Sequence, residues 1–204
     1  MTGRAHSALG VGVALSACEL LGLITSSNDI GRAAICVTVA ATAATLPDID
    51  VGAAKKVYKY SIMGLIVAFV TTVLFVVCRH GGIRGIPVSI IGMVAFCALS
   101  VYGEKQPHRG FTHSFLAAGL YVASITLTTM GMQVGYRKIV IASFLFAYLS
   151  HLVIDLLNKK GEQLLFPAKD RYCLRLCSAK GIGNEMTAVC GSFISIVMLG
   201  RLFV

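Results

Sequence analysis

The sequence predicts an all-α fold, a polytopic bundle of helices embedded in a membrane. Only 13% of its 204 residues are charged, whereas 56% are hydrophobic, and the mean hydropathy is +0.81. A soluble domain carries about 25% charged residues, so this chain lacks the polar side chains needed to cover a surface in water. Its apolar residues also fall into blocks of about 17–20, the length that crosses a bilayer as a helix. These observations exclude a cytosolic globular enzyme.

Seven blocks have the length and apolarity of membrane spans. In chain order they are residues 7–25, 31–47, 60–78, 85–103, 113–132, 138–157 and 186–204. The first ends before a polar stretch and has no small-residue cleavage site of the kind that ends a signal peptide. The second is rich in Ala, Thr and Val. Small residues let helices approach closely, which predicts a central position for this span.

The remaining spans are predicted on simpler grounds. The third, fifth and sixth are the strongest apolar runs. The fourth contains Pro87 near its start, where a missing N–H costs a helix little. The seventh follows the longest polar segment, residues 158–185, which is too short to form a domain and is expected to fold as a lid or re-entrant segment. We therefore expect one membrane-embedded domain over residues 1–204.

Basic residues indicate how the spans are oriented. The loops on the side where the chain begins are residues 1–6, 48–59, 104–112 and 158–185, and they contain most of the 18 Lys and Arg residues. The positive-inside rule then places this side, and with it the N-terminus, in the cytoplasm. These loops and their contacts with anionic lipid headgroups account for the net charge of +9, so we expect no nucleic-acid partner.

Ionisable residues gather where four of the predicted spans meet the cytoplasmic edge. They are His6, Asp48, Asp50, His108, Arg109, His113, His151 and Asp155. Ionisable groups at or within a membrane are costly and are candidates for function by default. Alternation of the spans brings these groups, from four separate helices, to one depth. The sequence therefore predicts a single site at the cytoplasmic edge.

The local spacings suit a metal site. His151 and Asp155 are four residues apart, on one face of a helix. Asp48 and Asp50 follow Pro47, where an extended stretch would point both carboxylates the same way. Imidazole and carboxylate together suit Zn, Mn or Fe, and there are enough groups for one or two divalent ions. The predicted metal ligands are His6, Asp48, Asp50, His108, His113, His151 and Asp155.

A pair of divalent ions is a recurrent device for hydrolysing phosphoesters. Arg109 and Asp50 are the predicted catalytic residues, and the guanidinium of Arg109 matches a phosphate group bidentately. Of the other acids, Glu104, Glu162 and Glu185 border the same side and are possible further ligands or general bases without a distinctive spacing.

Structural interpretations remain open for each group. The histidines would then be interfacial, Asp48 or Asp50 a helix cap, His151 and Asp155 a hydrogen-bonded pair, and Arg109 a cytoplasmic anchor. Glu19 lies too far along the first span to join the others and is expected to pair with a polar neighbour in the bundle.

The same residues form an ordered set of motifs. They are His6 with Gly10, Pro47-Asp48-Ile49-Asp50, His108-Arg109-Gly110-Phe111-Thr112-His113-Ser114, and His151 to Asp155 followed by Gly161 and Leu164-Leu165-Phe166-Pro167. In this order the chain resembles the YdjM-type family of LexA-regulated, inner-membrane, metal-dependent hydrolases. The resemblance covers residues 6–167, leaving out the basic loop and last helix, residues 168–204. It implies a bacterial inner-membrane protein with hydrolase activity, and supplies no substrate.

The hypothesis that follows is a membrane-bound metal-dependent hydrolase. A site at the boundary of lipid and water favours a membrane lipid or lipid-like substrate, such as a phospholipid or polyprenyl phosphoester. Two alternatives stay open, a divalent metal transporter or channel and a non-catalytic structural protein. A transporter usually has polar residues along the whole path, whereas here they gather at one edge.

Overall fold

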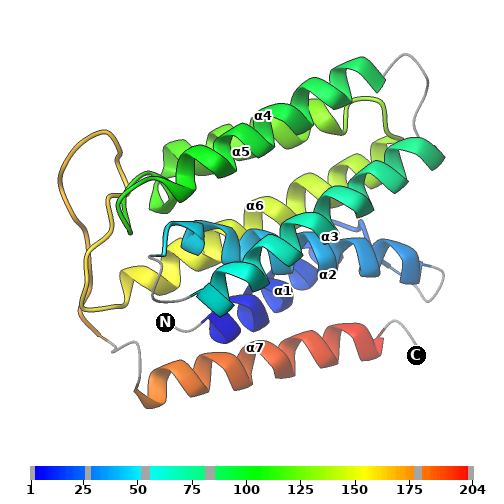
Figure 1. The fold of residues 1–204 in the computed structure, drawn as a ribbon. Coiled ribbons are helices and arrows are strands. Elements are labelled where there is room, and N and C mark those ends of the chain that lie inside the picture. Colours follow the sequence, from blue (N-terminus) through cyan, green and yellow to red (C-terminus); the bar gives the residue numbers. More distant parts are fainter. Residues whose placement is uncertain (1–2, 26–28, 52–55, 81–85, 177–180, 202–204) are drawn as a thin grey trace.

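Among the residues that the computed structural model describes, 3–25, 29–51, 56–80, 86–176 and 181–201, the fold is all-helical, as predicted. The helices are α1 (Gly3–Leu20), α2 (Ile30–Thr45), η2 (Leu46–Asp50), α3 (Lys56–His80), α4 (Ile86–Glu104), η5 (Phe111–His113), α5 (Phe115–Thr128), α6 (Val134–Leu156) and α7 (Ile182–Gly200). The η elements are short 3₁₀ helices. Successive α-helices run up and down a single bundle (Figure 1).

Helices α2 and α6 form the centre of the bundle. They pack against each other and against α1, α7 lies on the outer side of α1, and α4 pairs with α5 (Figure 1). In the most apolar part of residues 30–50, which comprise α2 and η2, 61% of residues are buried, compared with 11% in the most apolar part of α7. The Ala- and Thr-rich α2 therefore occupies the central position that its small residues predict, and α7 presents most of its surface outward.

The predicted count of seven membrane spans is wrong. Within the described part of the chain, five helices are long and apolar enough to cross a membrane, those at 30–50, 59–79, 86–104, 134–156 and 182–200. Helix α5 has 14 residues, about 21 Å of helix. The predicted span at 113–132 also included His113, the last residue of η5, and the turn after Thr128. Helix α1 carries Arg4, His6 and Glu19 in its 18 residues and is too polar to count.

Glycine allows α1 to approach its neighbours closely at two points. A Cβ atom on Gly10 would lie 2.3 Å from the Cβ atom of Ala44 in α2, and one on Gly191 in α7 would lie 2.4 Å from the backbone nitrogen of Leu9. Gly10 is one helical turn beyond His6, on the same face of α1. The close contact at Gly10 therefore holds the side chain of His6 against the centre of the bundle.

The segment after α6 closes one end of the bundle. Glu162 and Tyr172 form an antiparallel bridge, in which each backbone nitrogen donates to the other's carbonyl at 2.9 Å. The backbone nitrogen of Gln163 donates to the carbonyl of Arg109, and that of Leu174 donates to the carbonyl of Leu156. This loop is thereby fixed to the segment before α5 and to the end of α6 (Figure 1). It lies where the polar residues of the predicted site gather.

Candidate metal centre

Four segments meet at one end of the bundle (Figure 1). They are the start of α1, the end of α2 with η2, the segment around η5, and the end of α6. This end holds the eight residues predicted as site residues. Seven are at most 6% exposed, and they are His6, Asp48, Asp50, Arg109, His113, His151 and Asp155. The side chain of His108 is 42% exposed and forms the outer edge of the cluster. The structure therefore brings the predicted residues together.

The two aspartates of η2 point to different partners, contrary to the expectation that they point the same way. A 3₁₀ helix, η2, follows α2 directly and has Pro47 as its second residue. With three residues per turn, side chains two residues apart in a 3₁₀ helix diverge, whereas in an extended strand they would share a face. Asp48 accordingly lies near Nε2 of His113 and of His151, whereas Asp50 lies near His108, Thr112 and Nδ1 of His113, on the other edge of that ring.

Two imidazole nitrogens face each other at the centre of the cluster. His151 Nδ1 lies 2.6 Å from the carbonyl oxygen of Ala44, and because a carbonyl only accepts, Nδ1 donates. Thr112 Oγ1 donates to Asp50 Oδ2 at 2.7 Å and accepts from His113 Nδ1 at 3.1 Å. Each ring uses its Nδ1 proton in this way, so in the neutral state both Nε2 atoms carry lone pairs. The two Nε2 atoms are 3.3 Å apart, a distance that suits a proton on one of them or a cation bound by both.

Carboxylate oxygens complete a set of ligand atoms around these nitrogens. Asp48 Oδ1 lies 3.6 Å from His113 Nε2 and 3.9 Å from His151 Nε2, and Asp155 Oδ2 lies 3.9 Å from His113 Nε2. Ligands bound tetrahedrally at 2.0–2.1 Å stand about 3.3–3.4 Å apart. The observed separations are equal to that spacing or slightly longer, so small movements inward would coordinate an ion.

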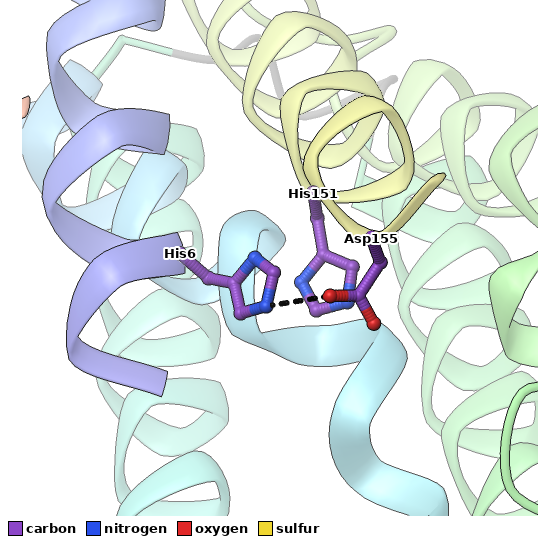
Figure 2. Close-up of side chains that lie close together, drawn as sticks. All are labelled: His6, His151 and Asp155. Atoms are coloured by element: carbon purple, nitrogen blue, oxygen red, sulfur yellow. Dashed lines mark ion pairs between the residues drawn. The ribbon is translucent and has the colours of Figure 1, made fainter. Parts of the chain in front are cut away.

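His6 extends the cluster by packing against the ring of His151. Its ring stacks on that of His151, with centroids 3.9 Å apart and an angle of 21° between the planes. His6 Nε2 lies 3.2 Å from Asp155 Oδ1 (Figure 2). Among the described residues Nδ1 of His6 has no hydrogen-bond partner, although it is buried, and Nε2 has the contact with Asp155. A buried imidazole nitrogen without a hydrogen-bond partner fits a metal ligand, because a bound ion would satisfy its lone pair.

Asp50 supports the histidines through both of its oxygens. Oδ1 accepts from His108 Nδ1 at 2.6 Å, and Oδ2 accepts from the backbone nitrogen of Arg109 at 3.1 Å in addition to the hydroxyl of Thr112. With Nδ1 occupied, His108 has Nε2 left for an ion. A carboxylate that binds the far nitrogen of a metal-binding histidine fixes its tautomer and orientation. The geometry of Asp50 fits this orienting role.

Arg109 is bound to the cluster by its backbone and its side chain. It has a positive φ of 66°, an uncommon conformation for a residue other than glycine, and this directs its backbone N–H to Asp50 and its side chain inward. The guanidinium donates to Asp155 Oδ2 at 2.5 Å and to the carbonyl of Lys160. Its Nε has no hydrogen-bond partner in the described part of the chain.

Burial and charge oppose each other in the cluster. Burial lowers the pKa of His113, but hydrogen bonds and the charges of Asp48 and Asp50 outweigh it and raise that pKa to about 10. The carboxylates therefore create a field that retains a positive charge at this position. A divalent ion bound at this position would supply positive charge to the same carboxylates in place of the proton.

Glu162 joins the cluster from the loop after α6. Its side chain is fully buried, and burial raises its pKa to about 8. His113, Asp155 and Glu162 each offer a ligand atom within 4.8 Å of the others, as do His6, His151 and Asp155, and likewise Asp48, His108 and His113. The sequence offers no spacing that singles out Glu162, since the bridge with Tyr172 positions it.

The other acidic residues lie apart from these groups. Glu19, near the end of α1, pairs with Arg201 at 2.9 Å, a polar partner of the kind that was predicted. Glu104 pairs with Lys59 at 2.5 Å. Glu185 is exposed near the start of α7.

The fold and the cluster together define a class, helical membrane proteins that gather buried histidines and carboxylates at one end of the bundle. Comparison of sequences gives the family: the chain matches the description "YdjM inner membrane protein" over residues 1–200. It belongs to the YdjM inner membrane protein family. The match includes α7, which lies beyond the motifs at 6–167. Neither the curated proteins nor the solved structures compared with the chain include a match.

Proposed function

We propose that this protein is a membrane-bound hydrolase that uses one or two divalent ions to cleave a phosphoester of an amphiphilic substrate. The observation that carries the proposal is the pair of Nε2 atoms of His113 and His151, which face each other at 3.3 Å among buried carboxylates. In the neutral state these two lone pairs would repel each other, so the buried carboxylates favour a positive charge between them, either a proton or a metal ion.

The residues divide into ligands and supporting groups. His113, His151 and Asp48 would hold one ion. His6 and Asp155, which form a further group with His151, extend the set far enough for a second. A bound Zn, Mn or Fe ion supplies a Lewis acid that polarises a phosphoryl oxygen and lowers the pKa of water. Asp50 fixes the orientation of His108 and of the Thr112–His113 segment.

Arg109 is the group of the cluster suited to the anionic part of the substrate. Its guanidinium charge lies beside Asp155, and its Nε proton is unused. A phosphoryl oxygen could accept from that proton while Asp155 and Lys160 keep the guanidinium in place.

The position of the cluster supports an amphiphilic substrate. It lies at the ends of α2 and α6, which have membrane-spanning length, and its outer edge is the exposed His108. A substrate whose apolar part stays in the bilayer could present its phosphoester at this end. The positive-inside rule favours the cytoplasmic side.

The test is phosphoester cleavage by protein purified in detergent and loaded with Zn²⁺, Mn²⁺ or Fe²⁺. Mixed micelles would contain phosphatidic acid or a polyprenyl phosphate, and ³¹P NMR would detect cleavage of any phosphoester bond. We expect turnover that falls at least tenfold in Asp48→Asn and His151→Ala. The matched control is Asp29→Asn, a carboxylate paired with Arg32 at the opposite end of α2.

Two results would overturn the proposal. One is cleavage at the wild-type rate in both site variants, which would place the reaction elsewhere. The other is absence of cleavage by metal-loaded protein together with Mn²⁺ uptake into sealed proteoliposomes, which would favour a transporter.

A further inference from the structure

Glu162 is a buried carboxylate that none of the sequence motifs explains. Its side chain is 0% exposed, and neither carboxylate oxygen has a hydrogen-bond partner among the described residues. An unpaired carboxylate without contact to water is strongly destabilising. Protonation alone does not remove the difficulty, because the resulting hydroxyl would need an acceptor as well.

The backbone holds Glu162 firmly in this position. Its nitrogen and carbonyl both pair with Tyr172, and the next residue, Gln163, donates to the carbonyl of Arg109. Arg109 itself does not neutralise Glu162, since its guanidinium binds Asp155 and Lys160, and no ion pair between Arg109 and Glu162 occurs in the part of the chain described. The chain therefore fixes an unpaired carboxylate beside the cluster.

The surroundings of Glu162 offer the partners that a cation needs. Ligand atoms of His113, Asp155 and Glu162 lie within 4.8 Å of one another, and all three residues are buried. One imidazole with two carboxylates is a set richer in oxygen than that around His151. Oxygen ligands favour Mn²⁺ over softer ions.

We propose that Glu162 is a further ligand of the centre, which binds a divalent cation of the Mn²⁺ type together with His113 and Asp155. The inference rests on the proposed function, because it adds a carboxylate to the same metal centre. It also makes the loop after α6 part of the site, since the bridge between Glu162 and Tyr172 positions the ligand.

The experiment compares the full-length wild type with Glu162→Gln by Mn²⁺ titration, monitored by electron paramagnetic resonance, and by the thermal shift that Mn²⁺ produces. The amide keeps the size of the side chain and removes its charge. We expect Mn²⁺ affinity to fall about tenfold or more and the thermal shift to shrink accordingly. Glu185→Gln, the same change at an exposed position, should bind as the wild type does.

The outcomes separate the inference from the proposed function. Unchanged Mn²⁺ affinity in a folded Glu162→Gln protein would overturn the inference and leave the metal centre standing. Failure of the wild type to bind Mn²⁺, Zn²⁺ or Fe²⁺ would overturn both. Should Glu162→Gln not fold, Glu162→Met removes the carboxylate and keeps an unbranched side chain, and Mn²⁺ affinity equal to that of the wild type would overturn the inference equally.

Discussion

Replacement of Asp50 by asparagine tests how the centre is held together. The two side chains have nearly the same size, so the change removes one charge and one acceptor. Asp50 Oδ2 accepts from the backbone of Arg109 and from Thr112, and an asparagine oxygen can keep both contacts. The amide NH₂ group then faces His108 Nδ1, which is 2.6 Å from Oδ1 in the native protein.

The expected effect follows from the tautomer of His108. To pair with an NH₂ group, His108 Nδ1 must accept, so its proton moves to Nε2, the nitrogen that was available to an ion. The substitution also removes the negative charge 3.5 Å from His113 Nδ1. Loss of such an orienting carboxylate typically lowers metal affinity 10–100-fold, about 1.4–2.7 kcal/mol.

Isothermal titration calorimetry of Zn²⁺ or Mn²⁺ into detergent-purified protein would measure this change. The control is Asp170→Asn, the same substitution at an exposed loop position. Wild-type affinity in a folded Asp50→Asn protein would refute the argument that Asp50 orients the histidines. Complete loss of metal binding would also refute the orienting role, because Asp50 would then be a metal ligand itself.

Three further predictions address packing, orientation and pH. Gly191→Ala should destabilise the protein by about 1–3 kcal/mol, because the new Cβ would meet the backbone of Leu9 at 2.4 Å; thermal melts in detergent would show a lower Tm than in Gly200→Ala, whose Cβ would meet nothing within 4 Å. In a chain otherwise free of cysteine, Arg4→Cys should react with a membrane-impermeant maleimide only after spheroplasts are permeabilised. Labelling in intact spheroplasts would contradict a cytoplasmic N-terminus. The pKa of His113 in the folded protein is raised from 6.5 to about 10. Its contribution to the stability of metal-free protein is therefore complete below pH 6.5 and disappears as the pH rises through 10. His113→Gln should flatten the curve of stability against pH between these values, and an unchanged slope would contradict the raised pKa of His113.

The sequence predicts the convergence of the site because alternation of helices is a strong constraint. Once seven apolar blocks are recognised, His6, Asp48, His113 and His151 must lie near the same end of the bundle, whichever blocks cross the bilayer completely. The α-helical elements agree with those blocks, although α5 is too short and α1 too polar to count as spans. Whether a helix counts as a membrane span is decided by its length and by the polarity of its ends, and both depend on where the helix stops.

Other features could not be predicted because contacts between distant segments determine them. The 3₁₀ turn of η2 makes the side chains of Asp48 and Asp50 point in different directions, whereas their two-residue spacing alone suggested a shared direction. Glu162 owes its burial to the bridge with Tyr172, ten residues further along an irregular loop. No periodic pattern marks such a position, so its acidic side chain looks the same as an exposed one in the sequence.

The contrast between the sealed interior of the cluster and its one exposed imidazole, His108, has a kinetic consequence. Ligand side chains such as His113 and His151 are completely buried, so a chelator in solution, like the phosphoester of a substrate, reaches an ion bound between them only past the edge that His108 forms. Exchange of such an ion would wait for the segment carrying His108 to open. We expect the rate of metal removal by a chelator to become independent of chelator concentration, with the opening of this segment as the slow step.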